Sequence, residues 1–216
     1  FAFVSTHLLN HALGLIGLDA MELGRLVFLF VWRSLPGTVL LYLALLTHLS
    51  LVLASIYRKR GWRQVAWAEF VQIGLGLSIP VLVAQHAVAN RGANAIYGVE
   101  DTYAFVLLAL WDQKPHLGFL QCVAIVVAWT HGCMGVHFWL RLKPSYALWR
   151  RVLYPIAILL PTLAIVGFVD AGRQFDHLMT DPIYRERLFA PLRALDPAAP
   201  AVIGDLVDRV WIGFGV

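Results

Sequence analysis

The sequence predicts an all-α membrane protein that forms a six-helix transmembrane bundle, and three observations support this. Of its 216 residues, 60% are hydrophobic and 14% are charged, with a mean hydropathy of +0.71. Apolar runs recur along the chain, each near the roughly 20 residues that cross a bilayer core. Basic residues gather between alternate runs, as membrane topology requires. An ordinary soluble domain is excluded, and the net charge of +4 reflects topology rather than a nucleic-acid partner.

The predicted spans form one domain that contacts the lipid bilayer. They cover residues 1–18, 37–56, 66–89, 117–140, 152–169 and 202–216, the last of them truncated. Phe1 begins inside an apolar run without a basic n-region or a small-residue cleavage site, so no signal peptide is expected. The chain reads as a fragment cut at both ends.

Three segments between the spans are not expected to cross the membrane. Asp19 to Ser34 is amphipathic and is predicted to lie at the outer interface. Tyr103 to Trp111 is apolar but too short to span, and is predicted to form a lid over the bundle. Asp170 to Pro200 is predicted to be an outer loop with one short helix. Three prolines fall inside spans, where neighbouring helices or hydroxyls can satisfy the carbonyls that they free: Pro80, Pro155 and Pro161, with Ser78 and Thr162 as the nearby hydroxyls.

The charges predict a multi-pass topology with both termini in the cytoplasm. Two loops are rich in bases and poor in acids, and are cytoplasmic by the positive-inside rule. One follows the second span and the other follows the fourth: Arg58, Lys59, Arg60 and Arg63, then Arg141, Lys143, Arg150 and Arg151.

Six of the eight histidines lie inside predicted spans. They are His7 and His11 in the first, His48 in the second, His86 in the third, and His131 and His137 in the fourth. Ionisable groups in a bilayer usually face the bundle interior and mark a site. An interhelical hydrogen bond explains any one of them equally well, but four successive helices each carry at least one.

The depths of these histidines predict two layers. His48 and His131 lie eight and nine residues before the inner ends of their spans, so they share an inner layer. His86 lies three residues from the outer end of its span, and the first helix brings His7 or His11 to the same outer level.

Two imidazoles at one depth, without a thiolate or carboxylate beside them, suit the axial positions of a haem iron. Such an iron has no open position, which favours electron transfer over oxygen chemistry. The sequence therefore predicts a four-helix core that holds two haem b groups. Cys122 and Cys133 have neither a CxxC spacing nor a disulfide framework. Five glycines could leave room for a flat macrocycle, although close helix packing explains them as well: Gly14, Gly74, Gly76, Gly132 and Gly135.

Four histidine-containing runs resemble the dihaem cytochrome b subunits of succinate dehydrogenases and fumarate reductases. They are VSTHLLNHALG, LLYLALLTHLSLVLASIY, VLVAQHAVANR and WTHGCMGVHFW. The resemblance, over roughly residues 1 to 145, implies that His7 and His86 hold a distal haem, and His48 and His131 a proximal one. The first motif is one residue shorter than in the family, so His11 remains an alternative to His7. His137 is about 240° round the helix from His131 and is interpreted as structural.

Other motifs resemble the haem-binding six-helix membrane anchors of bacterial class III adenylate cyclases. These are THLLNHALGL, DAMELGR, the WR before the second span and VEDTYAFVLLALW. The resemblance implies a bacterial inner membrane location, cytoplasmic ferredoxin-like and cyclase domains after the C-terminus, and a homodimer. No cyclase catalytic residues are present in this chain, so any adenylate cyclase activity is expected of the full-length protein.

The expected function is a dihaem domain that senses redox or quinone state and regulates a cytoplasmic adenylate cyclase in cAMP signalling. The alternative is the cytochrome b anchor of a succinate dehydrogenase or fumarate reductase-type quinone oxidoreductase. A third hypothesis, a haem-free anchor or transporter, predicts a colourless protein. Ubiquinone is a further candidate ligand, with a polar candidate site at Asn10, Gln85, Asn90, Arg91, Asp101, Tyr103 and Trp111. Haem propionates could contact Arg58, Lys59, Arg91 or Arg141, although topology explains these bases better.

Overall fold

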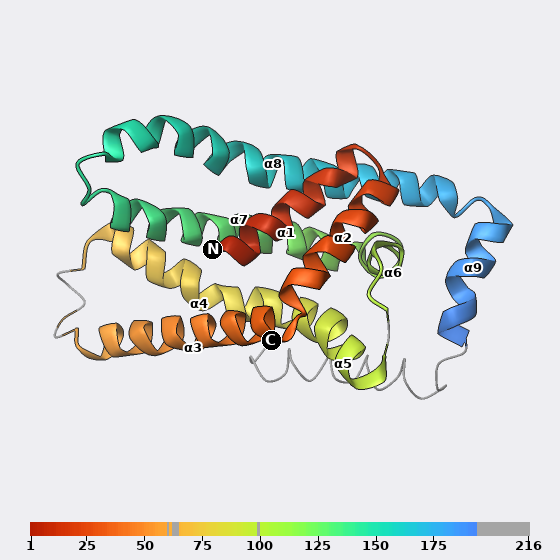
Figure 1. The fold of residues 1–216 in the computed structure, drawn as a ribbon, viewed down its shortest axis with the longest axis horizontal. Coiled ribbons are helices and arrows are strands. Elements are labelled where there is room, and N and C mark those ends of the chain that lie inside the picture. The colour runs from red at the N-terminus through yellow and green to blue at the C-terminus, as the bar shows by residue number, and fades with distance from the viewer. Residues whose placement is uncertain (60, 62–64, 99, 194–216) are drawn as a thin grey trace.

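The chain is described by a computed structural model that places all residues except 60, 62–64, 99 and 194–216. The described residues form helices joined by turns, and none of them is in a strand (Figure 1). The all-α prediction is therefore confirmed for this part of the chain.

Four helices are long and apolar enough to cross a membrane. They are α3 (Leu35–Tyr57), α4 (Trp67–Ala87), α7 (Pro115–Leu140) and α8 (Tyr146–Leu178). They correspond to the second to fifth predicted spans and run side by side along the long axis of the molecule (Figure 1). The end of α3 and the start of α4 lie at the same end of this bundle as the basic α7–α8 connection, which agrees with the positive-inside prediction that both connections are on one side. We call the opposite end the outer end.

The first predicted span is helical but shorter than predicted. Helix α1 (Ala2–Ala12) continues into the short 3-10 helix η1 (Leu13–Leu15). The eleven residues of α1 and the three of η1 together extend about 22 Å, less than the roughly 30 Å of a bilayer core. The chain then turns at Gly17, whose φ of 155° favours glycine, and α2 (Leu18–Trp32) runs back along α1. The helical segment thus ends at Leu15, three residues before the predicted end of the span.

Helix α2 is amphipathic as predicted, but its charged face points inward. Arg25 and Arg33 both pair with Asp101, which lies before α6. Apart from Asp19 in the first turn, the exposed residues of α2 are instead apolar, among them Leu23, Val27 and Phe30. The arginines of this helix therefore contact groups inside the protein, and its apolar face is exposed on the outside of the molecule.

Short helices build a cap at the outer end of the bundle. After α4 come the π-helix η3 (Val88–Gly92) and α5 (Ala93–Tyr97), followed by α6 (Tyr103–Leu107) and the π-helix η4 (Leu108–Gln113). Apolar side chains of α6 and η4 pack with side chains of α2 and of the outer part of α8 to form the larger buried core. Its residues are Leu18, Met21, Tyr103, Leu107, Leu108, Phe168, Ala171 and Phe175. Residues 103–111 therefore cover the bundle without crossing it, as predicted.

Helix α8 extends nine residues beyond the predicted end of the fifth span. The segment up to Leu178 is helical, and a second helix, α9 (Pro182–Arg193), follows. Phe175 is buried in the cap, and the side chain of Gln174 accepts a hydrogen bond from the backbone N–H of Leu18 at 2.9 Å. The predicted outer loop from Asp170 is thus wrong over its first third, because these cap contacts continue the helix. The predicted sixth span, residues 202–216, lies outside the described residues.

The three intraspan prolines lie inside helices as predicted, and a neighbouring helix supplies the partner for the carbonyl that Pro161 frees. A proline cannot donate to the carbonyl four residues before it, here Ala157. The indole of Trp129 on α7 donates to this oxygen at 2.8 Å. Thr162, the predicted donor, instead donates to Ile158 at 2.7 Å. Trp129 thereby joins α7 to α8.

Replacing Trp129 with phenylalanine is expected to destabilise the protein by about 1–3 kcal/mol, the cost of leaving a buried acceptor unpaired. Trp129 is 3% exposed, so water cannot easily replace the indole N–H. Thermal unfolding in detergent, followed by circular dichroism, measures the change. Trp139→Phe on the same helix is the control, because Trp139 is 64% exposed. Equal melting temperatures for the two variants would contradict the role of Trp129.

Candidate functional site

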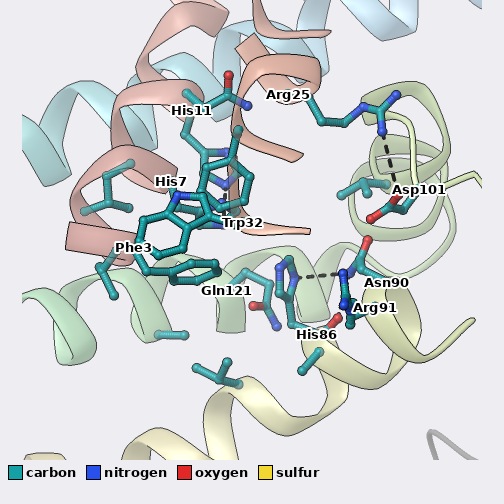
Figure 2. Close-up of a pocket in the computed structure, with 18 of the residues that line it drawn as sticks. Phe3, His7, His11, Arg25, Trp32, His86, Asn90, Arg91, Asp101 and Gln121 are labelled. Carbon is teal, nitrogen blue, oxygen red and sulfur yellow. Dashed lines mark hydrogen bonds and ion pairs between the residues drawn. The ribbon is translucent and has the colours of Figure 1, made fainter. Parts of the chain in front are cut away.

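A cavity of about 390 Å³ lies in the outer half of the bundle. Side chains from α1, α2, α3, α4, α6, α7 and α8 line it, most of them apolar (Figure 2). Sites for small molecules and cofactors typically enclose about 300–1,000 Å³ and carry a few polar groups on apolar walls. The cavity has the size and lining of such a site.

Two of the predicted outer histidines, His7 and His86, face each other across this cavity. Their ring centres are 6.0 Å apart and their planes are inclined by 65°. With nitrogen–metal bonds of about 2.0 Å, two imidazoles on opposite sides of one metal ion have ring centres about 6 Å apart. Asn90, one turn after His86, donates to the His86 carbonyl at 2.7 Å. The outer pair thus has the spacing of two axial ligands.

His11 is the third imidazole at the outer level. Its Nε2 lies 3.2 Å from Nε2 of His7, one turn away on the same face of α1. The side chain is 8% exposed, and its buried Nδ1 has no hydrogen-bond partner within the described structure. His7 is the one that opposes His86 at the ligand spacing, while His11 lies next to it and lines the same cavity. His11 therefore remains an alternative ligand.

The inner histidines, His48 on α3 and His131 on α7, also face each other. Their ring centres are 6.0 Å apart, and the planes are inclined by 80°. The helices that carry them are the two that the sequence predicts for the inner layer. None of the residues of α3 is buried, so few protein contacts hold this helix against the bundle.

Gln72 on α4 holds His131 by two hydrogen bonds. Nδ1 of His131 lies 3.1 Å from the backbone carbonyl oxygen of Gln72, and the side-chain amide of Gln72 donates to the His131 carbonyl at 3.0 Å. Because a carbonyl only accepts, Nδ1 carries the hydrogen and Nε2 keeps its lone pair. Histidines that bind metals usually donate their other N–H to a carbonyl or carboxylate in this way. Sequence reasoning did not identify Gln72.

The five glycines interpreted as room for a macrocycle have different roles. Gly76 lies against the His131 ring, whereas Gly14 packs on the backbone of Gly167. Gly132 lies against the Phe1 ring, and the exposed Gly74 has open space where a side chain would begin. The interpretation is therefore wrong for Gly14 and Gly132, which allow close packing of protein groups.

Replacing Gly76 with alanine is expected to displace His131 and to lower the content of the haem that the sequence predicts at the inner pair. A Cβ at this position would lie 2.8 Å from Cε1 of His131, a ring that Gln72 holds in place. Haem per chain, measured as the pyridine haemochrome, should fall from two towards one. Gly74→Ala, on the same helix with open space around it, is the matched control. Full haem content in both variants would refute the close fit at Gly76.

His137 does not point towards either pair. Its Nδ1 lies 2.5 Å from the hydroxyl of Tyr146, at the start of the next helix. This contact ties α7 to α8 at the inner end and agrees with the structural interpretation of His137.

Five of the seven candidate quinone-site residues line the outer cavity. Gln85 and Trp111 do not, and the indole of Trp111 donates to Asp176 at 2.8 Å. The residues that do are Asn10, Asn90, Arg91, Asp101 and Tyr103. The amide of Asn10 donates to the Tyr103 hydroxyl at 2.6 Å. Burial raises the pKa of Tyr103, so its phenol remains protonated and keeps its own hydrogen to donate.

Two arginines that were predicted to lie at the outer interface, Arg25 and Arg33, also line the cavity. Their side chains are 14% and 21% exposed, because both pair with Asp101. The inward direction of these side chains depends on contacts between α2 and the segment before α6. The sequence shows only that the cations are regularly spaced along a helix. This spacing does not tell whether they point into the protein or away from it.

Within the described residues, no group of three or more histidine, cysteine, aspartate or glutamate side chains is placed to hold a metal ion. A porphyrin supplies four nitrogen ligands itself, so a haem needs only the two axial imidazoles that each pair offers. Comparisons with protein-family models, curated proteins and solved structures found no match to the chain.

Proposed function

We propose that this chain is a dihaem b-type membrane domain that carries electrons between two sides of a bilayer. The observation that carries the proposal is the repeated geometry of the histidine pairs. His7 with His86, and His48 with His131, each have ring centres 6.0 Å apart and come from different helices. Interhelical hydrogen bonds could explain one such pair, but not the same ligand spacing twice.

The two pairs lie at different depths, which suits electron transfer across the membrane. On α4, Gly76 contacts the ring of His131, and His86 follows ten residues later. At 1.5 Å per residue, the two levels are about 15 Å apart along the helix. One level is near the cytoplasmic half of the bundle and the other lies beneath the outer cap.

The residues present fit the group. Haem, when bound, supplies an iron that changes oxidation state by one electron. His7 and His86 would hold one haem, and His48 and His131 the other, and two imidazole ligands to each iron would favour electron transfer over oxygen chemistry. Gln72 and Gly76 fix the orientation of His131, and the lid formed by α6 and η4 keeps water from the outer site.

A quinone such as ubiquinone is the proposed electron partner at the outer end. Asn10, Asn90 and Tyr103 supply donors and acceptors on the wall of the outer cavity, within reach of the His7 and His86 pair. This part of the proposal is tested by titrating the reduced protein with a soluble ubiquinone and following haem oxidation. Loss of oxidation in Tyr103→Phe, with both haems retained, is the expected result.

We further propose, from the sequence motifs shared with class III cyclase anchors, that the redox state of this domain regulates a cytoplasmic adenylate cyclase. The alternative is the anchor subunit of a quinone oxidoreductase, as the histidine motifs also allow. Sequencing the gene beyond Val216 separates the two, because only the first requires cyclase catalytic residues in the same chain. Copurification with flavin and iron–sulfur subunits would favour the second.

The experiment that tests the central proposal is a reduced-minus-oxidised absorption spectrum of the purified protein, together with a pyridine haemochrome count. Two b-type haems per chain are expected. A colourless protein, after expression with ample haem supply, would refute electron transfer and leave a haem-free membrane anchor. One haem per chain would restrict the proposal to one of the two histidine pairs.

A further inference from the structure

The outer cavity has an excess of positive charge that the histidine pairs do not explain. Three arginines line it, Arg25, Arg33 and Arg91, and Asp101 is the one acidic residue on its wall among the described residues. Cations enclosed by an apolar wall favour a ligand with negative charge, because burial weakens their screening by water.

The arginines differ in how far their charges are already neutralised. Arg25 pairs with Glu22 and lies 3.7 Å from Asp101, and Arg33 pairs with Asp101. Asp101 is thus shared between two cations, and its side chain is 11% exposed. Arg33 also donates to Asn94 at 3.1 Å.

Arg91 has no acidic partner within the described part of the chain. Its guanidinium donates to the hydroxyl of Thr38, at the long distance of 3.5 Å. Arg91 lies in η3, five residues after His86, and Figure 2 shows it beside His86 and Asn90 at one edge of the cavity. A guanidinium in this position can form two parallel hydrogen bonds to a carboxylate.

We propose that Arg91, assisted by Arg33, binds the propionate carboxylates of the outer haem. This inference depends on the proposed function, because it assumes a haem between His7 and His86. The macrocycle then lies among the apolar walls, with its carboxylate edge towards η3 and the loop that carries Asp101. Arg91, which has no acidic partner among the described residues, can pair with one propionate, and Arg33, which Asp101 already neutralises in part, assists with the other.

The charge of Arg91 has a consequence for the reduction potential. A nearby cation stabilises the ferrous form of a haem relative to the ferric form, since reduction adds a negative charge. Arg91→Gln is therefore expected to shift the ferric–ferrous equilibrium of the outer haem about tenfold towards ferric, equivalent to about 59 mV for one electron. Arg91→Lys keeps the charge and should restore most of the potential but not the bidentate geometry.

The first test is a potentiometric titration of the full chain with both haems bound. The outer haem is identified as the one absent from His86→Ala. In Arg91→Gln its potential should fall while that of the inner haem stays unchanged. Arg150→Gln, an exposed arginine at the inner end of α8, is the matched control and should change neither potential. An unchanged outer potential in Arg91→Gln overturns the inference.

The second test uses haem dimethyl ester, which lacks the propionate charges. In haem-depleted wild-type protein the ester should bind the outer site at least tenfold more weakly than haem, and Arg91→Gln should reduce this difference. Equal affinities of the two haems for the wild-type outer site would overturn the inference. If the wild-type protein binds no haem, the proposed function itself fails; if it binds two haems and Arg91→Gln behaves as wild type, only this inference fails.

Discussion

Replacing His131 with alanine is expected to remove the proposed inner haem and to lower the stability of the protein. The change deletes one axial ligand of the inner pair, leaving His48 without its partner 6.0 Å away. It also removes the hydrogen bond from His131 to the Gln72 carbonyl, and a typical hydrogen bond contributes about 0.5–1.5 kcal/mol. Loss of a bound ligand destabilises further, since haem binds only the folded protein.

The measurement combines a haemochrome count with thermal unfolding in detergent. Haem per chain should fall from two to one, and the melting temperature should fall as well. His137→Ala is the matched control on the same helix, because His137 contacts Tyr146 and neither histidine pair. Normal expression, spectrum and melting temperature in His131→Ala would be incompatible with an inner haem at this position.

Much of this site follows from local sequence. The four long spans are visible as uninterrupted apolar runs, and the helical rise alone places His48 and His131 at one depth and His86 at another. Which residues of two helices contact each other also depends on how each helix is rotated about its own axis. Uninterrupted apolar runs do not determine this rotation. Here both predicted pairs do face each other, with ring centres 6.0 Å apart in each pair.

Contacts between distant segments explain what the sequence did not predict. Arg25 and Arg33 point inward because both pair with Asp101. Asp101 is more than 60 residues away from them in the sequence but adjacent in space. Gln174 continues α8 outward because it binds the start of α2. The sequence around Arg25, Arg33 and Gln174 carries no information about these distant partners. Neither the inward direction of the two arginines nor the C-terminal end of α8 can therefore be predicted from it.

The crossing of α1 and α8 is the other part of the fold that the histidine site requires. A Cβ on Gly167 would lie 2.2 Å from the carbonyl oxygen of His11 and 3.1 Å from Cα of Ala12. A Cβ on Gly14 would likewise lie 2.2 Å from the Gly167 oxygen. Such small residues allow two helix backbones to touch. The obstructing atoms are backbone, so no side-chain rotation can relieve an added methyl group.

Gly167→Ala is therefore expected to push α1 away from α8 and to destabilise the protein by about 3 kcal/mol, the upper part of the usual range for overpacking. Because α1 carries His7 and His11, the same displacement should remove the outer haem and spare the inner one, whose ligands lie on α3 and α7. Thermal unfolding and the haem count measure the two effects, with Gly74→Ala as the control at a position that has open space for an added methyl group. A variant that melts lower but keeps both haems would separate the α1–α8 crossing from haem binding. Loss of the inner haem alone would contradict the assignment of α1 to the outer site.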